Sequence, residues 1–266
     1  MLQSAMQSQL ARLKFHFLLG GKRTISEKYL GAMATFLENA SEEIQVLSKH
    51  NKHWTCKGKR SIAIAAKLLE QNEIIAIPTD TIYGLAGTLS STSIKKLYEI
   101  KQRDINKPLS ISVNNVKNIK QWGIVDHLSD KMLTQILPGP YTIILKRTAA
   151  LNPALNPNHD TIGIRVPKYK FINCVSKIVG PLVLSSANIS NEKNCLYASE
   201  FKHLWPTLGG IFHDSDRYGR SKNSFRKGST IVDLSEPQCY KIIRHGIGKE
   251  YLISLLEQYH LQNCFS

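Results

Sequence analysis

The folded part of the chain begins with two apolar patterns, one with helical spacing and one typical of a strand. Residues 61–71 place apolar side chains at helical spacing, and residues 74–78 form a short β-branched run that ends in proline. A polar turn at 79–81 and a second amphipathic segment at 93–101 follow. The pattern predicts a helix that leads into a buried strand, and then a turn and another helix.

Short apolar runs and amphipathic segments alternate along the rest of the chain. The runs that predict strands lie at residues 109–113, 141–146, 161–166, 181–186, 209–212, 229–234 and 240–244. The stretches that predict helices lie at residues 127–137, 169–179 and 249–259. Some strands follow one another too closely for a helical crossover, so we expect an α/β fold in which helices flank an open sheet of mixed strand direction.

The segment before this pattern has a different composition. Its first 26 residues contain basic side chains but no acidic ones; the basic residues are Arg12, Lys14, Lys22 and Arg23. This composition is typical of a mitochondrial transit peptide, and a basic disordered tail is the alternative. We expect a transit peptide over 1–32, with Met33 available as the start of a shorter cytosolic product, and a polar, basic linker over 33–60. The predicted localisation is therefore the mitochondrion and the cytoplasm.

Charge and hydrophobicity narrow the class of protein. The chain has 266 residues, 42% of them hydrophobic, which is enough to bury the core of one domain of about 200 residues with an extension. Its 35 Lys and Arg against 20 Asp and Glu give a net charge of +15, which attracts phosphate-bearing partners such as ATP or RNA. No apolar run approaches the roughly 20 residues that a membrane span requires.

Several common functional motifs are absent from the sequence. It contains no GxxxxGK[ST] loop, no GxGxxG loop and no GxSxG elbow, and the segment LGGKRT at 19–24 lacks the first glycine of a P-loop. His50, His53 and Cys56 lack a fourth partner for structural zinc. The five cysteines form no CxxC pair, so we expect reduced thiols in an intracellular compartment rather than a disulfide framework.

Polar residues gather at the ends of the predicted strands, where an open α/β sheet tends to bind its ligands. The segment PTDTIYGLAG (78–87) follows a buried strand directly. The segment KQRDINKPLSIS (101–112) contains Lys101, Arg103 and Lys107, which are close enough in sequence to share one polyphosphate. Taken alone, the second segment is better explained as a solvated charge run, because such runs are common on exposed faces.

Further motifs complete a pattern that resembles the YrdC-domain family across residues 61–248. The motifs are LPGPYTIILK (137–146), TIGIRVP (161–167), VLSSANIS (183–190), GSTIVDL (228–234) and IIRHG (242–246). Their order and approximate spacing are those of the family. The resemblance implies a YrdC-like fold with a twisted sheet and a concave, positively charged face. It also implies a catalytic domain over 61–248, followed by a C-terminal helix and tail over 249–266.

The resemblance also implies an activity. Family members join L-threonine, bicarbonate and ATP into threonylcarbamoyl-AMP and release pyrophosphate, with Mg²⁺ carried by ATP and no metal ligand from the protein. A separate transferase complex then passes the group to tRNA, which yields N6-threonylcarbamoyladenosine in tRNAs that read codons beginning with A. The chain would thus be an ATP-binding nucleotidyltransferase for tRNA processing. Because two anions must meet and no protein nucleophile is needed, we expect catalysis by positioning and electrostatics.

The family's motifs assign roles to individual residues. The KxR…SxN signature corresponds to the catalytic residues Lys101, Arg103, Ser186 and Asn188. The ATP-binding positions are Arg103, Lys107, Thr161, Ser186, Asn194 and Arg244. The L-threonine-binding positions are Thr81, Arg165, Ser229 and Thr230. The chain departs from the family at Asn191, where relatives commonly have glycine, at Ser112, where many have histidine, and at Lys107, which is often asparagine.

Two other functions are compatible with parts of this pattern. A non-catalytic protein that binds double-stranded RNA or tRNA would use the same basic face, but backbone binding needs only cations and not the hydroxyl and amide groups of Thr81, Ser186 and Asn188. A carbamoyl-transfer module resembling that of hydrogenase-maturation proteins would require zinc-finger-like and acylphosphatase-like segments, which this sequence lacks.

Overall fold

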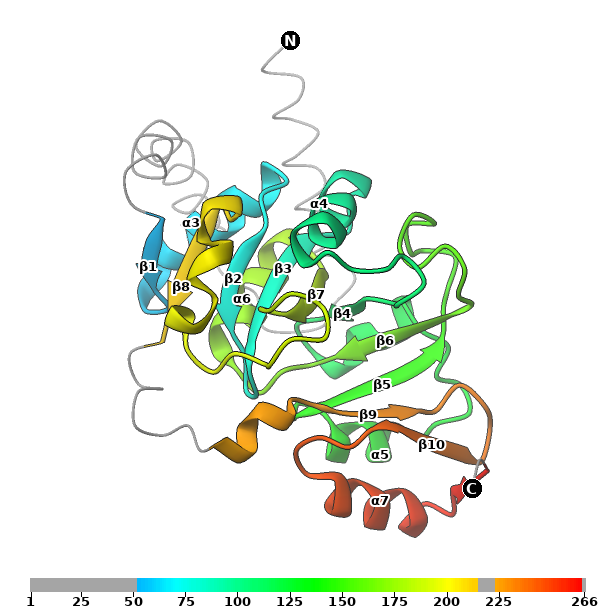
Figure 1. Cartoon of the computed structure of the whole chain (residues 1–266). Coiled ribbons are helices and arrows are strands. Elements are labelled where there is room, and N and C mark those ends of the chain that lie inside the picture. The colour runs from blue at the N-terminus through cyan, green and yellow to red at the C-terminus, as the bar shows by residue number, and fades with distance from the viewer. Residues whose placement is uncertain (1–51, 215–222, 265–266) are drawn as a thin grey trace. The chain divides into compact units, whose positions relative to one another are not determined.

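The computed structural model of the chain describes residues 52–214 and 223–264, all of which belong to one compact unit (Figure 1). The transit peptide expected over 1–32, the segment at 19–24 and His50 lie outside the described residues. Within the described ranges, no helix has the length and apolar character needed to cross a membrane.

The described strands form one mixed sheet in the order β1-β8-β2-β3-β7-β4-β6-β5-β9-β10-β11. They span His53–Thr55 (β1), Ile75–Pro78 (β2), Tyr83–Thr88 (β3), Ser110–Ser112 (β4), Tyr141–Lys146 (β5), Thr161–Arg165 (β6), Leu182–Ser186 (β7), Gly210–His213 (β8), Thr230–Asp233 (β9), Cys239–Arg244 (β10) and Gln262–Asn263 (β11). Pairs such as β4/β6 and β5/β9 are parallel, whereas β3/β7 and β5/β6 are antiparallel. The predicted α/β fold with a mixed sheet is confirmed.

Helices connect and flank the strands. The α-helices span Gly58–Glu70 (α3), Ser91–Lys101 (α4), Asp130–Ile136 (α5), Lys170–Val179 (α6) and Lys249–Gln258 (α7), and 3₁₀ helices span Val116–Gln121 (η1), Ala198–Thr207 (η2) and Asn223–Lys227 (η4). Ser90 caps α4 by accepting a hydrogen bond from the amide of Ser93, and Ser129 caps α5 in the same way. Figure 1 shows α7 alongside β10 near the C-terminal end of the described chain.

One face of the sheet forms the main apolar core. Residues paired across neighbouring strands lie on the same face, and Ile111, Ile164 and Ile143 form one such row, each fully buried. They belong to a cluster that also contains Leu97 of α4 and Leu133 of α5. The burial of this row explains why β4, β6 and β5 read as apolar runs.

The opposite face carries smaller and more polar side chains. Ser110, Gly163 and Ile144 form the adjacent row, and each is only half-buried. At β8 this face is covered by α3 and α6, which pack together, and the rings of Phe171 in α6 and Phe212 in β8 lie 5.2 Å apart. We use the term site face for the part of this face that lies over β7, β4, β6, β5 and β9.

The sequence pattern missed the strand β3. Its segment YGLAGT contains two glycines, which have low strand propensity, so no strand was predicted there. The packing requires these glycines, since a Cβ atom at Gly84 would lie 2.7 Å from Cδ1 of Leu184, and one at Gly87 would lie 2.7 Å from Cδ1 of Ile74. Tertiary contacts thus override local propensity in this strand.

The sheet also begins earlier than predicted. We expected a linker as far as residue 60, but β1 pairs in parallel with β8 and α3 already begins at Gly58. The ring of Trp54 stacks on Phe212 with centroids 5.5 Å apart. Three residues are too few to show a hydrophobic period, so this edge strand could not be recognised from its pattern.

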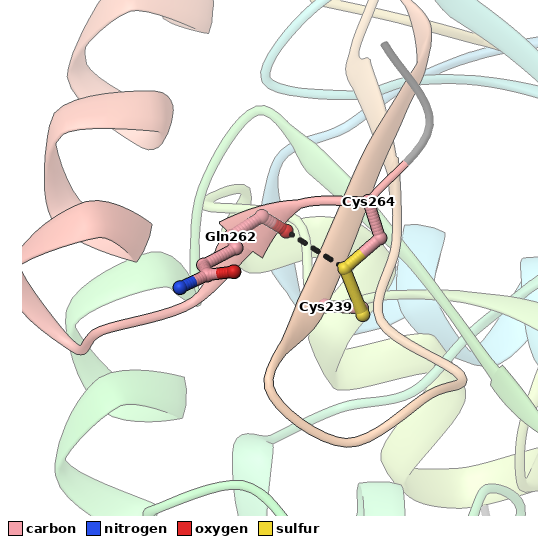
Figure 2. Close-up of a disulfide and its surroundings, with 3 residues drawn as sticks. All are labelled: Cys239, Gln262 and Cys264. Atoms are coloured by element: carbon pink, nitrogen blue, oxygen red, sulfur yellow. Dashed lines mark hydrogen bonds between the residues drawn. A yellow bond between two sulfur atoms is a disulfide. The ribbon is translucent and has the colours of Figure 1, made fainter.

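A disulfide joins Cys239 at the start of β10 to Cys264 after β11 (Figure 2). Their Cα atoms are 5.5 Å apart, and the Sγ of Cys264 lies 3.5 Å from the carbonyl oxygen of Gln262. The expectation that the cysteines are reduced is therefore wrong for this pair. The two residues are 25 positions apart and meet only because α7 returns the chain to the sheet edge, which the sequence spacing does not reveal.

Candidate active site

The PTDT turn after β2 is held by its own threonines. The hydroxyl of Thr79 donates to the carbonyl of Ile82 at 2.8 Å and accepts from the amide of Thr81 at 3.1 Å. The hydroxyls of Thr79 and Thr81 are also 3.1 Å apart, and both residues are buried. The turn thus presents Thr81 and Asp80 at the end of a fully buried strand.

Arg165 at the end of β6 reaches this turn. Its Nη2 donates to Oδ1 of Asp80 at 2.8 Å and to the hydroxyl of Thr81 at 3.2 Å, while Oδ2 of Asp80 accepts from the amide of Lys168. The two side chains are only 8% and 10% exposed. Burial raises the pKa of Asp80, while the charge of Arg165 and the amide of Lys168 act against that rise.

Two buried polar atoms beside this ion pair have no hydrogen-bond partner in the structure. They are the Nε of Arg165 and the hydroxyl of Ser112. Ser112 and Arg165 are directly paired between β4 and β6, so their side chains leave the sheet on the same face. Unpaired buried polar groups are costly, and these two are therefore suited to a polar ligand.

Lys101, the last residue of α4, lies in a different environment from the one predicted. It is 1% exposed, and its Nζ donates to the carbonyl oxygens of Ser186 and Asn188, at 2.6 Å each. Burial, assisted by the charge of Arg103, lowers the pKa of Lys101 to about 7. We predicted that Lys101 would share a polyphosphate with Arg103 and Lys107; in the structure it falls on the buried side of α4, and its Nζ faces backbone carbonyls.

The bonds from Lys101 shape the loop that follows β7. Ser186 ends β7 opposite Gly84 of β3, and Asn188 is buried two residues later. The side-chain Nδ2 of Asn188 donates to the backbone carbonyls of Ile189 and Glu192 at 2.7 and 2.9 Å. The lysine of the KxR motif and the asparagine of the SxN motif therefore hold backbone carbonyls of the same loop.

Arg103 and Lys107 lie in the loop after α4, closer to solvent. Arg103 donates to the carbonyls of Lys107 and Pro108 at 2.9 Å each, and Nζ of Lys107 donates to Oδ1 of Asn191 at 3.1 Å. Asn191 has a φ of 72°, in the left-handed region that glycine favours and asparagine tolerates. Asparagine therefore preserves the backbone at a position where glycine is common in the family.

Ser229 and Thr230, both buried, point in opposite directions as neighbours on an extended strand do. The hydroxyl of Ser229 lies 2.9 Å from that of Thr142. The hydroxyl of Thr230 donates to the carbonyl of Ile247 and accepts from the amide of Gly246, so it is used within the fold. Of the two predicted positions, Ser229 is the one that lies on the site face.

A β-bulge directs Arg244 toward the site face. In the β9/β10 pair, Ile242 is opposite Val232 and Arg244 is opposite Ile231, so Ile243 is the extra residue. If the strand paired regularly, Ile243 would be opposite Ile231 and Arg244 would be one position further on, pointing to the other face, because side chains alternate along a strand. In the observed register, Arg244 donates to the carbonyl and the hydroxyl of Ser229 at 2.8 to 3.1 Å.

Arg244 lies within electrostatic reach of two other arginines. Burial lowers the pKa of Arg244, and the charges of Arg165 and Arg103 lower it further. Asn194 belongs to the same group, since a Cβ atom at Gly228 would lie 3.3 Å from Nη2 of Arg244 and 3.6 Å from Nδ2 of Asn194. Anionic groups would be stabilised between these side chains.

Thr161 lies apart from this cluster. It is the first residue of β6, at the opposite end from Arg165, and it is paired with Lys146 of β5. Four residues of an extended strand span about 13 Å. A ligand that contacts both Thr161 and Arg244 would therefore have to extend across the site face.

His53 and Cys56, for which the sequence offered no complete set of zinc ligands, both contact His213 in the structure. The Nδ1 of His53 lies 2.7 Å from Nε2 of His213, and the amide of Cys56 donates to the carbonyl of His213. Over the described ranges, no group of three or more His, Cys, Asp or Glu side chains could hold a metal ion.

Two residues near the site were not predicted from the sequence. Arg226 and Glu200 form an ion pair at 2.5 Å beside Asn194, and they line a cavity of about 470 Å³. The two residues are 26 positions apart and belong to no motif, so only the fold brings them together.

Comparison with known proteins gives consistent matches. The Sua5/YciO/YrdC family model, described as telomere recombination, matches residues 67–246. The threonylcarbamoyl-AMP synthase of Homo sapiens is 34% identical over 221 residues, which are 82% of this chain and 77% of the human protein. The putative threonylcarbamoyl-AMP synthase of Methanocaldococcus jannaschii is 36% identical over 190 residues, or 71% of this chain and 87% of that protein.

Solved structures share the fold. E. coli YciO superposes with a TM-score of 0.64 at 22% identity, covering 74% of this chain and 94% of that one. P. abyssi Sua5 in complex with L-threonine gives a TM-score of 0.62 at 22% identity, covering 69% of this chain and 54% of that one.

Proposed function

The chain belongs to the Sua5/YciO/YrdC family, and from this membership and the site geometry we infer that it is a threonylcarbamoyl-AMP synthase. The observation that carries the inference is that Arg165 and Arg244 both lie on the site face beside the hydroxyl groups of Ser112 and Ser229, with the charge of Arg103 in reach of Arg244. A synthase must bring together substrates that are all anionic or carry a carboxylate. The three guanidinium groups offset the repulsion between these substrates.

The reaction has two bond-forming steps. The amine of L-threonine attacks the carbon of bicarbonate, water leaves, and a carbamate forms on the threonine nitrogen. An oxygen of this carbamate then attacks the α-phosphorus of ATP, and pyrophosphate leaves with the electron pair of the broken P–O bond. No group of the protein becomes covalently bound, so the chain contributes orientation and charge.

The threonine end is assigned to Arg165 and Thr81. The Nε of Arg165 is buried without a partner and is available to a carboxylate oxygen, while Nη2 is already fixed by Asp80 and Thr81. Ser112 offers a second unpaired polar atom on the same face, and Ser229 lies between this end and Arg244.

The nucleotide end is assigned to Arg103, Lys107 and Arg244 for the phosphates, with Ser186, Asn194 and Thr161 as further contacts. Lys101 and Asn188 act indirectly: they fix the backbone of the loop after β7 and do not contact the phosphates themselves. Mg²⁺ carried by ATP would supply further neutralisation of the phosphate charge, next to Arg103, Lys107 and Arg244.

We propose that the product is passed to a tRNA threonylcarbamoyl-transferase complex and that the chain contacts tRNA only as part of that transfer. Binding of RNA without catalysis is not favoured, since it leaves the buried Arg165 and Ser112 without a role. We further propose that the chain occurs in the mitochondrion and the cytoplasm, which fluorescent fusions starting at Met1 and at Met33 would test.

The proposed function is tested by supplying the full chain with ATP, Mg²⁺, bicarbonate and L-threonine and measuring pyrophosphate. Release should require both bicarbonate and L-threonine, and L-alanine should not replace L-threonine. If ATP binds but the complete mixture releases no pyrophosphate, the synthase is excluded and the RNA-binding alternative takes its place.

A further inference from the structure

The ion pair between Glu200 and Arg226 lies outside the predicted site. It connects two segments that border the site, the loop after Asn194 and the segment 226–229. Oε1 of Glu200 accepts from Nη2 of Arg226 at 2.5 Å, and Oε2 accepts from Nη1 at 3.1 Å. Oε2 also accepts from the amides of Leu196 and Tyr197 at 2.7 and 3.0 Å. The carboxylate of Glu200 therefore fixes the loop after Asn194 and the side chain of Arg226 together.

Arg226 continues this link to Asn194 itself. Its Nη1 donates to the backbone carbonyl of Asn194 at 2.8 Å, and its own carbonyl accepts from Nδ2 of Asn194 at 2.7 Å. Because a carbonyl can only accept, the amide orientation of Asn194 is determined by this bond. The side chain must present Oδ1, an acceptor, to any ligand beside it.

The segment 227–229, which follows Arg226, borders the site on the side of Arg244. Gly228 has a φ of 69° and lies against Arg244 and Asn194, and Ser229 follows it. A guanidinium presents only donors and Oδ1 presents only an acceptor. Arg244 therefore suits phosphate, whereas Asn194 suits a donor on the nucleoside, such as a ribose hydroxyl or the adenine amine.

We propose that Glu200 and Arg226 are positioning residues for the nucleoside part of ATP: their ion pair holds the amide of Asn194 at a set distance from Arg244. The proposal deepens the proposed function and rests on it only for the kinetic measurements. The two acting residues touch Asn194 and the backbone, and the ligand contact is made by Oδ1 of Asn194.

The test compares two variants with a matched control in the full chain. Glu200→Gln removes the charge at nearly constant shape, and Arg226→Lys keeps the charge but loses the fork that reaches both Glu200 and Asn194. Glu236→Gln is the control, since it breaks the Lys146–Glu236 pair, in which the side chains are 45% and 51% exposed. Calorimetric titration with ATP and with tripolyphosphate separates nucleoside from phosphate binding, and thermal unfolding monitors the fold.

Both variants should bind ATP about 10-fold more weakly, which corresponds to about 1.4 kcal/mol. Tripolyphosphate affinity and the KM for L-threonine should stay within about two-fold of wild type, and 2′-deoxy-ATP distinguishes the ribose from the base. Unchanged ATP affinity in either folded variant overturns the proposal, as does an equal loss for tripolyphosphate. If wild type releases no pyrophosphate, the synthase assignment fails, and the two titrations still decide whether the ion pair positions a nucleotide.

Discussion

The Nζ of Lys101 donates a 2.6 Å hydrogen bond to the carbonyl oxygen of Asn188, which lies 87 positions further along the chain. A second bond of the same length goes to the carbonyl of Ser186. The lysine of the KxR motif thus connects the end of α4 to the loop after β7. Its contribution to catalysis would come from the shape of that loop.

The burial of Lys101 predicts a pH dependence of stability. Its pKa is about 7 in the folded chain against 10.5 ordinarily, so between these values the unfolded chain binds more protons and the free energy of unfolding rises with pH. The slope approaches about 1.4 kcal/mol per pH unit. Above pH 9 the trend is opposed by Cys195, because burial raises the pKa of its thiol to about 11.

Urea unfolding between about pH 7 and pH 9 measures this slope, and the Lys101→Met variant provides the comparison. Methionine fills a similar volume but does not titrate, so the rise should be absent in the variant. An equal slope in wild type and Lys101→Met would show that another group is responsible.

Replacement of Arg165 by lysine should affect threonine binding more than ATP binding. Lysine keeps the positive charge beside Asp80 but has no Nε and no planar fork, so the unpaired donor assigned to the threonine carboxylate is lost. We expect the KM for L-threonine to rise about 10-fold or more and the KM for ATP to change by less than about three-fold. Steady-state kinetics with each substrate varied in turn measures both, and a rise confined to ATP would contradict the assignment.

Replacement of Arg244 by leucine should remove a phosphate contact. The variant keeps the bulge at Ile243 but has no guanidinium group beside Ser229. ATP affinity should fall by about 100-fold, which corresponds to about 2.7 kcal/mol for a charge-assisted contact, while L-threonine still binds. The control is Ile243→Ala, which changes the neighbouring half-exposed side chain and leaves Arg244 in place. Unchanged ATP affinity in Arg244→Leu would exclude a phosphate role for Arg244.

The sequence predicted the elements of the sheet where burial imposes a clear period. Residues 141–146 were predicted as a strand and form β5, because alternate side chains there face the core. The strand β3 was missed, since its glycines are required by contacts with Leu184 and Ile74 that no local pattern encodes. Local propensity therefore identifies elements that bury large side chains and misses those that allow close packing.

The candidate site likewise contains residues that the sequence motifs identified and residues that only the fold revealed. The motifs identified most of the polar groups that meet at the arginine cluster, but they could not show that Lys101 is buried. A signal was present, because Ile94, Leu97 and Lys101 share one helical face of α4. The Glu200–Arg226 pair had no signal, since its members come from segments with no motif in common. Roles that depend on which carbonyl or amide a side chain meets are visible only in the structure.

The disulfide between Cys239 and Cys264 should stabilise the C-terminal edge of the sheet without serving catalysis. It closes a loop of 25 residues, and a loop of that size gives about 3.5 kcal/mol in the chain-entropy model. The bond lies at the start of β10, whereas Arg244 lies at the end, so the arginine register should not depend on it. We expect Cys264→Ser to lower the free energy of unfolding by about 2–3 kcal/mol and to leave the KM for ATP unchanged. Cys174→Ser is the control, because that thiol forms no disulfide. Mass spectrometry of the alkylated chain with and without reductant verifies the bond. Equal stability of the two serine variants would show that the disulfide contributes nothing to the free energy of unfolding.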